Sequence, residues 1–95
     1  MQLIGIDHIV PKAILKRLGA PSCVINHTSN LQPLPMEDNR EKWANILYGE
    51  WWINPHYAKE NVARKWIIDN YGSEMWYGLC RYGIRYLWEG NNATD

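Results

Sequence analysis

The sequence contains no phenylalanine, only two cysteines and no long apolar run. A membrane-spanning helix needs about 20 consecutive apolar residues, so no membrane span is predicted. Cys23 and Cys80 form no CxxC pair, which argues against a structural zinc site and favours free thiols in a reducing compartment over a disulfide. The first residues lack the charged and apolar regions of a signal peptide, and we therefore expect a cytoplasmic protein.

Net charge is also missing, because 10 basic and 10 acidic residues give a formal net charge of zero. This balance argues against a protein that holds nucleic acid by bulk charge alone, since non-specific affinity rises with the number of phosphates neutralised. It does not exclude a site where a bound divalent ion adds positive charge locally. The basic residues form small groups along the chain: Lys12, Lys16 and Arg17; Arg40 and Lys42; Arg64 and Lys65; Arg81 and Arg85.

Aromatic residues are abundant, with six Trp and six Tyr. A chain of this length buries only about 60–65% of its unfolded surface, so these large side chains are expected to supply much of the core. Their excess in the second half favours a homodimer formed through an exposed apolar face. A compact monomer and docking on a different protein are the alternatives. The tryptophans behind this expectation are Trp51, Trp52, Trp66, Trp76 and Trp88.

The first third of the chain alternates extended and helical patterns. Residues 2–6 are β-branched or aliphatic and predict a short strand. A short helix is predicted over 13–18, closed by Gly19. Residues 22–29 are typical of a polar loop, and two prolines keep 30–35 extended because each disfavours helix at the preceding residue.

Three helices are predicted in the rest of the chain. The first covers 37–48, with acidic residues in its first turn, where the helix dipole favours them, and with Trp43 on its apolar stripe. The second covers 54–71, begins with an Asn-Pro start signal and is closed by Gly72. The last covers 73–86, and its two internal glycines weaken it by about 1 kcal/mol each relative to alanine.

Three polar blocks follow one another in the first half: DHIVP at 7–11, NLQPL at 30–34 and NREK at 39–42. Hydrolysis of a phosphodiester needs an activated water, a cation at the leaving oxygen and a scaffold that orients both. Asp7 offers a hard oxygen ligand suited to Mg²⁺ or Mn²⁺. His8 titrates near neutral pH and can accept a proton from water.

The later blocks add two further candidates. Asn39, at a predicted helix start, could give an amide oxygen to the same ion, and Lys42, one turn later, could contact a phosphate. By propensity alone Asn30 and Asn39 also fit turns and helix caps. Their residue types therefore allow either a structural role or a role in the site.

Together the three blocks resemble the HNH endonuclease motif, which in many members reads DHIxP, then NLxxL, then Asn or His with a Lys three residues later. DHIVP is also similar to the HNH domain of CRISPR RNA-guided nucleases, in which two Asn are separated by the interval seen between Asn30 and Asn39. The resemblance covers 4–43. It implies an α+β fold in which a small ββα-metal unit over 1–48 is followed by a helical extension over 49–95, in a single domain.

The resemblance also implies a role for each matching residue. Asp7 and Asn39 would be the protein ligands of one divalent ion, Mg²⁺ or Mn²⁺. His8 would be the general base, and Asn30 would hold the loop between the two strands and so fix the orientation of His8. Many HNH proteins carry CxxC pairs for a structural zinc, but 34–38 contains no cysteine, so no zinc is expected.

DNA is the expected partner, and the residues predicted to contact it are Lys12, Lys16, Arg17, Arg40 and Lys42. A solvated basic face is the alternative for the first three. The implied reaction is hydrolysis of DNA phosphodiesters to 3′-hydroxyl and 5′-phosphate ends, with one active site nicking one strand. The small size suits a phage or mobile-element protein in the host cytoplasm. The competing hypothesis is a non-catalytic DNA- or protein-binding module, or an accessory subunit of a larger DNA-processing complex.

Overall fold

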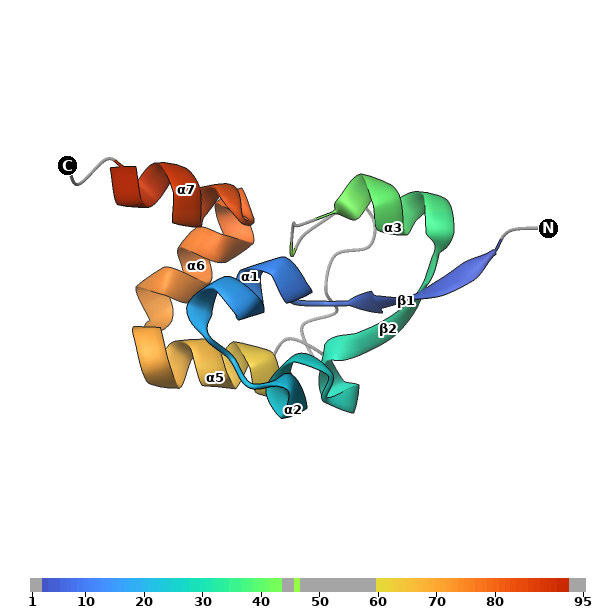
Figure 1. Cartoon of the computed structure of the whole chain (residues 1–95), viewed down its shortest axis with the longest axis horizontal. Coiled ribbons are helices and arrows are strands. Elements are labelled where there is room, and N and C mark those ends of the chain that lie inside the picture. Colours follow the sequence, from blue (N-terminus) through green and yellow to red (C-terminus); the bar gives the residue numbers. More distant parts are fainter. Residues whose placement is uncertain (1–2, 44–45, 47–59, 93–95) are drawn as a thin grey trace.

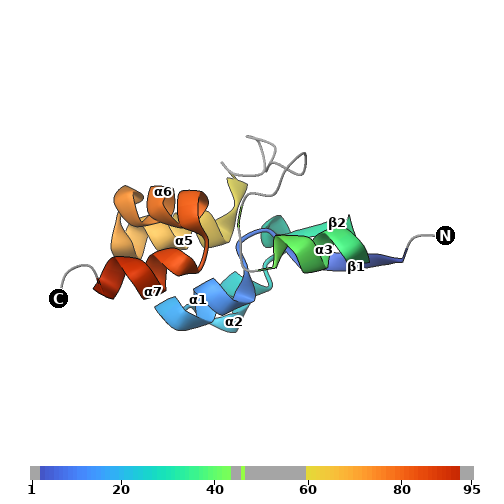
Figure 2. The ribbon, with the colours of Figure 1, turned by 90° about the horizontal axis from the view of Figure 1, so that it is seen from above.

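The protein is a mixed α+β chain that joins a two-stranded antiparallel sheet to a group of helices (Figure 1). A computed structural model describes residues 3–43, 46 and 60–92, and gives only the backbone for 89–92. The Cα trace extends over 48 × 23 × 23 Å. The strands and α3 lie toward one end of this long axis and α5, α6 and α7 toward the other (Figures 1 and 2).

The sheet is formed by β1 (Ile4–His8) and β2 (Leu31–Pro35), which are antiparallel, with Ile4 opposite Pro35 and His8 opposite Leu31. Proline is tolerated in a strand where its missing N–H faces away from the partner strand. Pro33 and Pro35 occupy alternate positions, and the next residue, Met36, donates its N–H to the carbonyl of Leu3 at 2.9 Å. The nitrogen atoms of both prolines therefore face away from β1, where no hydrogen bond to that strand is lost. Relative to the predicted strand over 2–6, β1 is shifted so that it includes Asp7 and His8.

Three short helical segments connect the strands: α1 (Lys12–Leu18), α2 (Ser22–Ile25) and the 3₁₀ turn η1 (Thr28–Asn30). The prediction for α1 is confirmed, since Gly19 ends it with a φ of 84°, a value that favours glycine. The prediction of a loop over 22–29 is wrong in part. Pro21 precedes α2 and its carbonyl accepts hydrogen bonds from two residues of that turn, which nucleates a helix in a polar segment.

The helix after β2, α3 (Met36–Lys42), is shorter than the predicted helix over 37–48. Trp43 ends it with a φ of 44°, a left-handed value that is uncommon for a bulky residue. Trp43 is also 64% exposed, so its predicted place on a buried stripe is wrong. Most of the rest of the predicted helix, 44–45 and 47–48, lies outside the described residues.

The second half contributes α5 (Val62–Tyr71), α6 (Ser73–Tyr82) and α7 (Arg85–Asn92). Asn61 caps α5 by accepting a hydrogen bond from the N–H of Arg64 at 3.1 Å, and Gly72 ends it as predicted. The predicted start of this helix at residue 54 lies outside the described residues. The single helix predicted over 73–86 is wrong, because the chain breaks at Gly83 with a φ of 62°.

One buried apolar cluster joins the two halves of the chain. Its members come from the segment after β1, from α1, from α2 and from the three C-terminal helices, and they include Ile9, Val10, Ile14, Leu15, Ile67, Trp76, Leu79 and Leu87. The sheet contributes less, since Ile4 and Ile6 are 59% and 62% exposed. No helix in the described part of the chain is long and apolar enough to span a membrane.

Candidate active site

A hollow of about 310 Å³ opens where β1 ends. Asp7, His8 and Asn39 all line it, together with Lys12 and Trp43. Neighbouring residues of a strand point to opposite faces, but Asp7 and His8 are the last two residues of β1 and both line this hollow. Asp7, His8 and Asn39 thus line one hollow, although they come from β1 and α3. Asn30, the fourth residue that the motif predicts, does not line it.

The imidazole of His8 is half-buried and is held by Asn26, the residue that ends α2. His8 Nε2 lies 2.8 Å from Asn26 Oδ1. An amide oxygen only accepts hydrogen bonds, so this contact fits the tautomer in which Nε2 carries the ring proton and Nδ1 is the basic nitrogen. Sequence reasoning missed Asn26. The available signal was weak, since an Asn in a polar segment fits a turn equally well.

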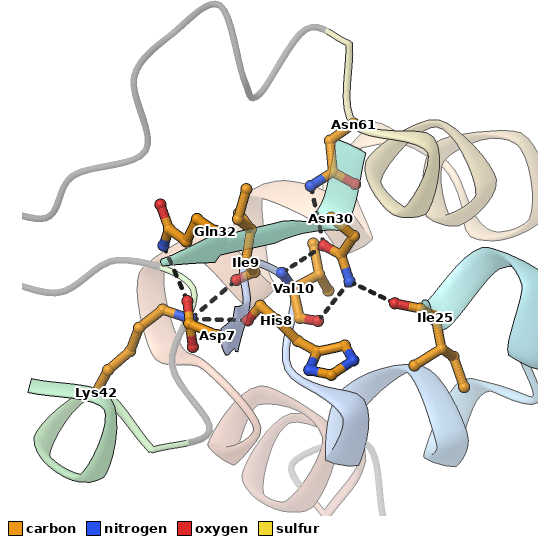
Figure 3. A network of polar contacts seen from close by, with 9 residues as sticks. All are labelled: Asp7, His8, Ile9, Val10, Ile25, Asn30, Gln32, Lys42 and Asn61. Carbon is orange, nitrogen blue, oxygen red and sulfur yellow. Dashed lines mark hydrogen bonds and ion pairs between the residues drawn. The ribbon is translucent and has the colours of Figure 1, made fainter. Parts of the chain in front are cut away.

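Asn30 is fully buried and ties the connection between the strands together (Figure 3). Its Nδ2 donates to the carbonyls of Val10 at 3.1 Å and Ile25 at 3.0 Å. Its Oδ1 accepts from the N–H of Val10 at 2.8 Å and from Asn61 Nδ2 at 3.0 Å. These bonds fix the connection between the strands at Val10, two residues after His8, and at Ile25, the residue before Asn26.

Asp7 is 4% exposed and its carboxylate already accepts several hydrogen bonds (Figure 3). Lys42 Nζ lies 2.9 Å from Oδ2 and 3.1 Å from Oδ1, and Gln32 Nε2 donates to Oδ2 at 2.9 Å. A carboxylate has about four lone-pair positions. The observed contacts therefore hold Asp7 in one orientation without using all of its acceptor capacity.

Lys42 was predicted to contact a DNA phosphate, but the structure places it in the interior. Its side chain is fully buried, and its ammonium group also donates to the carbonyls of His8 at 2.9 Å and Ile9 at 3.1 Å. Burial lowers the pKa of Lys42 because it removes water from the ammonium group, and the contact with Asp7 opposes that shift. In this position Lys42 is a structural partner of Asp7 and of the end of β1. A phosphate outside the protein has no access to it.

Asn39 lies on the face of α3 that packs against β1. A Cβ added to Gly5 would lie 2.7 Å from Met36 Sδ and 3.6 Å from Asn39 Nδ2. The backbone of Gly5 therefore lies next to the side chains of Met36 and Asn39, where α3 packs against β1. Sequence reasoning had not assigned any role to Gly5.

The other predicted DNA contacts lie on the surface. Lys12, Lys16, Arg17 and Arg40 are exposed, and Lys12 lines the hollow itself. Lys16 and Arg17 are in the last turn of α1, where the helix dipole also favours positive charge. Exposure leaves these residues accessible to a phosphate, but it fits a solvated basic face equally well.

The chemistry of the donors decides which metal ion would fit. Asp7 and Asn39 offer a carboxylate and an amide oxygen on the wall of one open hollow, a set that suits a hard, partly hydrated cation such as Mg²⁺ or Mn²⁺. Among the described residues, no three His, Cys, Asp or Glu side chains are grouped in a way that could hold a metal ion.

Comparison with known proteins gives no match to this chain, whether with family models, with curated proteins or with solved structures.

Proposed function

We propose that this protein is a metal-dependent DNA endonuclease of the HNH, ββα-metal type. The observation that carries the proposal is that Asp7, His8 and Asn39, taken from two motif blocks far apart in the sequence, line one open hollow. The order of β1, β2 and α3 along the chain supports the same assignment. The basic residue Lys12 on its rim provides charge for a phosphate.

In the proposed reaction His8 acts as the general base. Its Nδ1 takes a proton from a water molecule, the water oxygen forms a bond to phosphorus, and the bond from phosphorus to the 3′ oxygen breaks. The 3′ oxygen takes a proton from solvent, which leaves a 3′-hydroxyl and a 5′-phosphate. Asn26 positions the ring through Nε2, and Asn30 fixes the segments on both sides of it.

Asp7 and Asn39 would hold one Mg²⁺ or Mn²⁺ ion. When bound, the ion would supply positive charge that stabilises the phosphate and the leaving oxygen. Lys42 and Gln32 hold the carboxylate of Asp7 in place, so that the ligand is oriented before the ion arrives. Because the protein ligands are so few, we expect weak binding and a protein that purifies largely free of metal.

Nicking of a supercoiled plasmid tests the proposal. The purified protein should convert supercoiled DNA to the open-circular form with Mg²⁺ or Mn²⁺ and should stop when EDTA is added. Circular dichroism should stay unchanged in EDTA, because the fold needs no ion. Absence of nicking with either metal would contradict the endonuclease, and unfolding in EDTA would contradict the proposed metal site.

A non-catalytic binding module is the second candidate, and one observation favours it. Both oxygens of Asp7 already accept hydrogen bonds from Lys42 or Gln32, so the motif can serve as a scaffold without any ion. Titration with Mn²⁺, followed by its electron paramagnetic resonance signal, separates the two. The endonuclease predicts Mn²⁺ binding that Asn39→Ala weakens, whereas a scaffold predicts no binding by either protein.

A further inference from the structure

A second hollow, of about 350 Å³, lies on the helical side of the candidate active site. Its wall is formed by Trp43, Arg81, Tyr82, Ile84 and Arg85. Trp43 also lines the first hollow, so the two hollows lie next to each other and share this residue.

The aromatic side chains at this junction are unusually open to solvent. Trp43 is 64% exposed, Tyr82 51% and Trp88 40%. The rings of Trp43 and Trp88 lie with their centroids 6.3 Å apart, a spacing typical of aromatic pairs. Trp43 is held there by a left-handed backbone with a φ of 44°. Such conformations are strained and cluster at functional sites.

The charge of the second hollow is positive. Arg81 and Arg85 are both exposed, and within the described part of the chain no carboxylate pairs with either of them. The Arg81 guanidinium lies 5.6 Å from the centre of the Tyr82 ring. Exposed guanidinium groups beside solvent-open aromatic rings match a ligand that alternates phosphates with flat bases.

We propose that this surface, formed by Trp43, Arg81, Tyr82 and Arg85 and named here the aromatic-arginine surface, binds single-stranded DNA next to the scissile phosphate. A base stacks on Trp43, and Arg81 and Arg85 contact the phosphates beyond it. Unpaired bases are required, because a base inside a duplex has no free face for an indole. The proposal rests on the proposed endonuclease function and adds its substrate class: DNA that is single-stranded or locally unpaired.

Binding measured without metal tests this surface independently of cleavage. The probe is a fluorescein-labelled oligonucleotide of mixed sequence, as a single strand and as a duplex, with fluorescence anisotropy read in EDTA. Trp43→Ala and Arg85→Ala are compared with matched controls at residues that line neither hollow: Tyr77→Ala, which removes a 68% exposed aromatic ring, and Lys65→Ala, which removes a 74% exposed cation. Circular dichroism confirms that each variant folds.

The wild type should bind the single strand more tightly than the duplex. Trp43→Ala should weaken single-strand binding about 5-fold or more, as expected for loss of one stacked base. Arg85→Ala should also reduce the slope of log affinity against log salt by about 0.7, the value for one phosphate contact on a single strand. Tyr77→Ala and Lys65→Ala should change neither quantity.

Two results would overturn the inference: equal affinities for Trp43→Ala, Arg85→Ala and their controls, or tighter binding of the duplex. Plasmid nicking separates this failure from failure of the proposed function. A wild type that nicks while these variants bind normally overturns the aromatic-arginine surface alone. A wild type that never nicks, with variants that lose single-strand binding, overturns the endonuclease and supports the surface.

Discussion

Lys42 is a buried cation that forms an ion pair with the buried carboxylate of Asp7. Replacing Lys42 by Met should destabilise the fold by about 3–5 kcal/mol, because the Asp7 carboxylate would remain buried without its counter-ion. Lys65→Met is the matched control: Lys65 pairs with Asp69 on the surface, where such a pair contributes about 0.2–0.5 kcal/mol. Urea denaturation of the three proteins measures the difference. Equal stabilities of the two variants would show that the buried pair is not formed.

The residues of the site were only partly predictable from the sequence. The residue types in the motif blocks, and the resemblance of those blocks to the HNH motif, led to Asp7, His8 and Asn39, which all line one hollow. Their partners were not predictable, because hydrogen bonds such as those of His8 with Asn26 and of Lys42 with Asp7 join residues 18 and 35 positions apart. Residue type alone suggested a phosphate contact for Lys42, and only the packing of α3 against β1 shows that it is buried.

At the scale of the helices, Gly78 in α6 packs against the ring of Tyr86 in α7, and a Cβ at this position would overlap that ring. Alanine normally stabilises a helix interior by about 1 kcal/mol relative to glycine. We expect the opposite sign here: Gly78→Ala should lower the thermal midpoint, and the double variant Gly78→Ala, Tyr86→Ala should lose less than the two single changes added together. Differential scanning calorimetry measures all three. A raised midpoint for Gly78→Ala would contradict this packing.

The glycines at helix ends show which helix boundaries the local sequence pattern predicts and which it does not. Gly19 and Gly72 were correctly predicted to end helices, because each follows an apolar repeat that stops. The break at Gly83 was missed, since apolar residues continue beyond it at helical spacing. The turn there is favoured by burial of Ile84 and Leu87 in the core, which is a tertiary effect that the spacing does not contain.

At the scale of the whole molecule, the common core decides how much aromatic surface is left for a partner. Trp76 is 5% exposed and belongs to that core, so it does not need a second copy to cover it, whereas Trp88 is 40% exposed. Trp51 and Trp52 lie outside the described residues. The predicted homodimer, which would place two nicking sites on one duplex, therefore stays a prediction.

Light scattering at micromolar concentration tests the dimer. We expect a mass twice the 11.2 kDa of one chain, because exposed apolar faces on small proteins are commonly paired by two-fold symmetry. A mass equal to one chain would contradict the stable homodimer and favour the monomer or docking on a different protein.

Plasmid nicking with one pair of variants tests whether His8 is the general base of an endonuclease. His8→Ala should lower the nicking rate by about 10²–10⁴-fold, the usual contribution of general-base assistance. His27→Ala should nick at the wild-type rate, because His27 is exposed and its imidazole ring, among the described residues, hydrogen-bonds only to Ser29. Both variants should keep the wild-type circular dichroism spectrum. Nicking by His8→Ala at the wild-type rate would contradict the account.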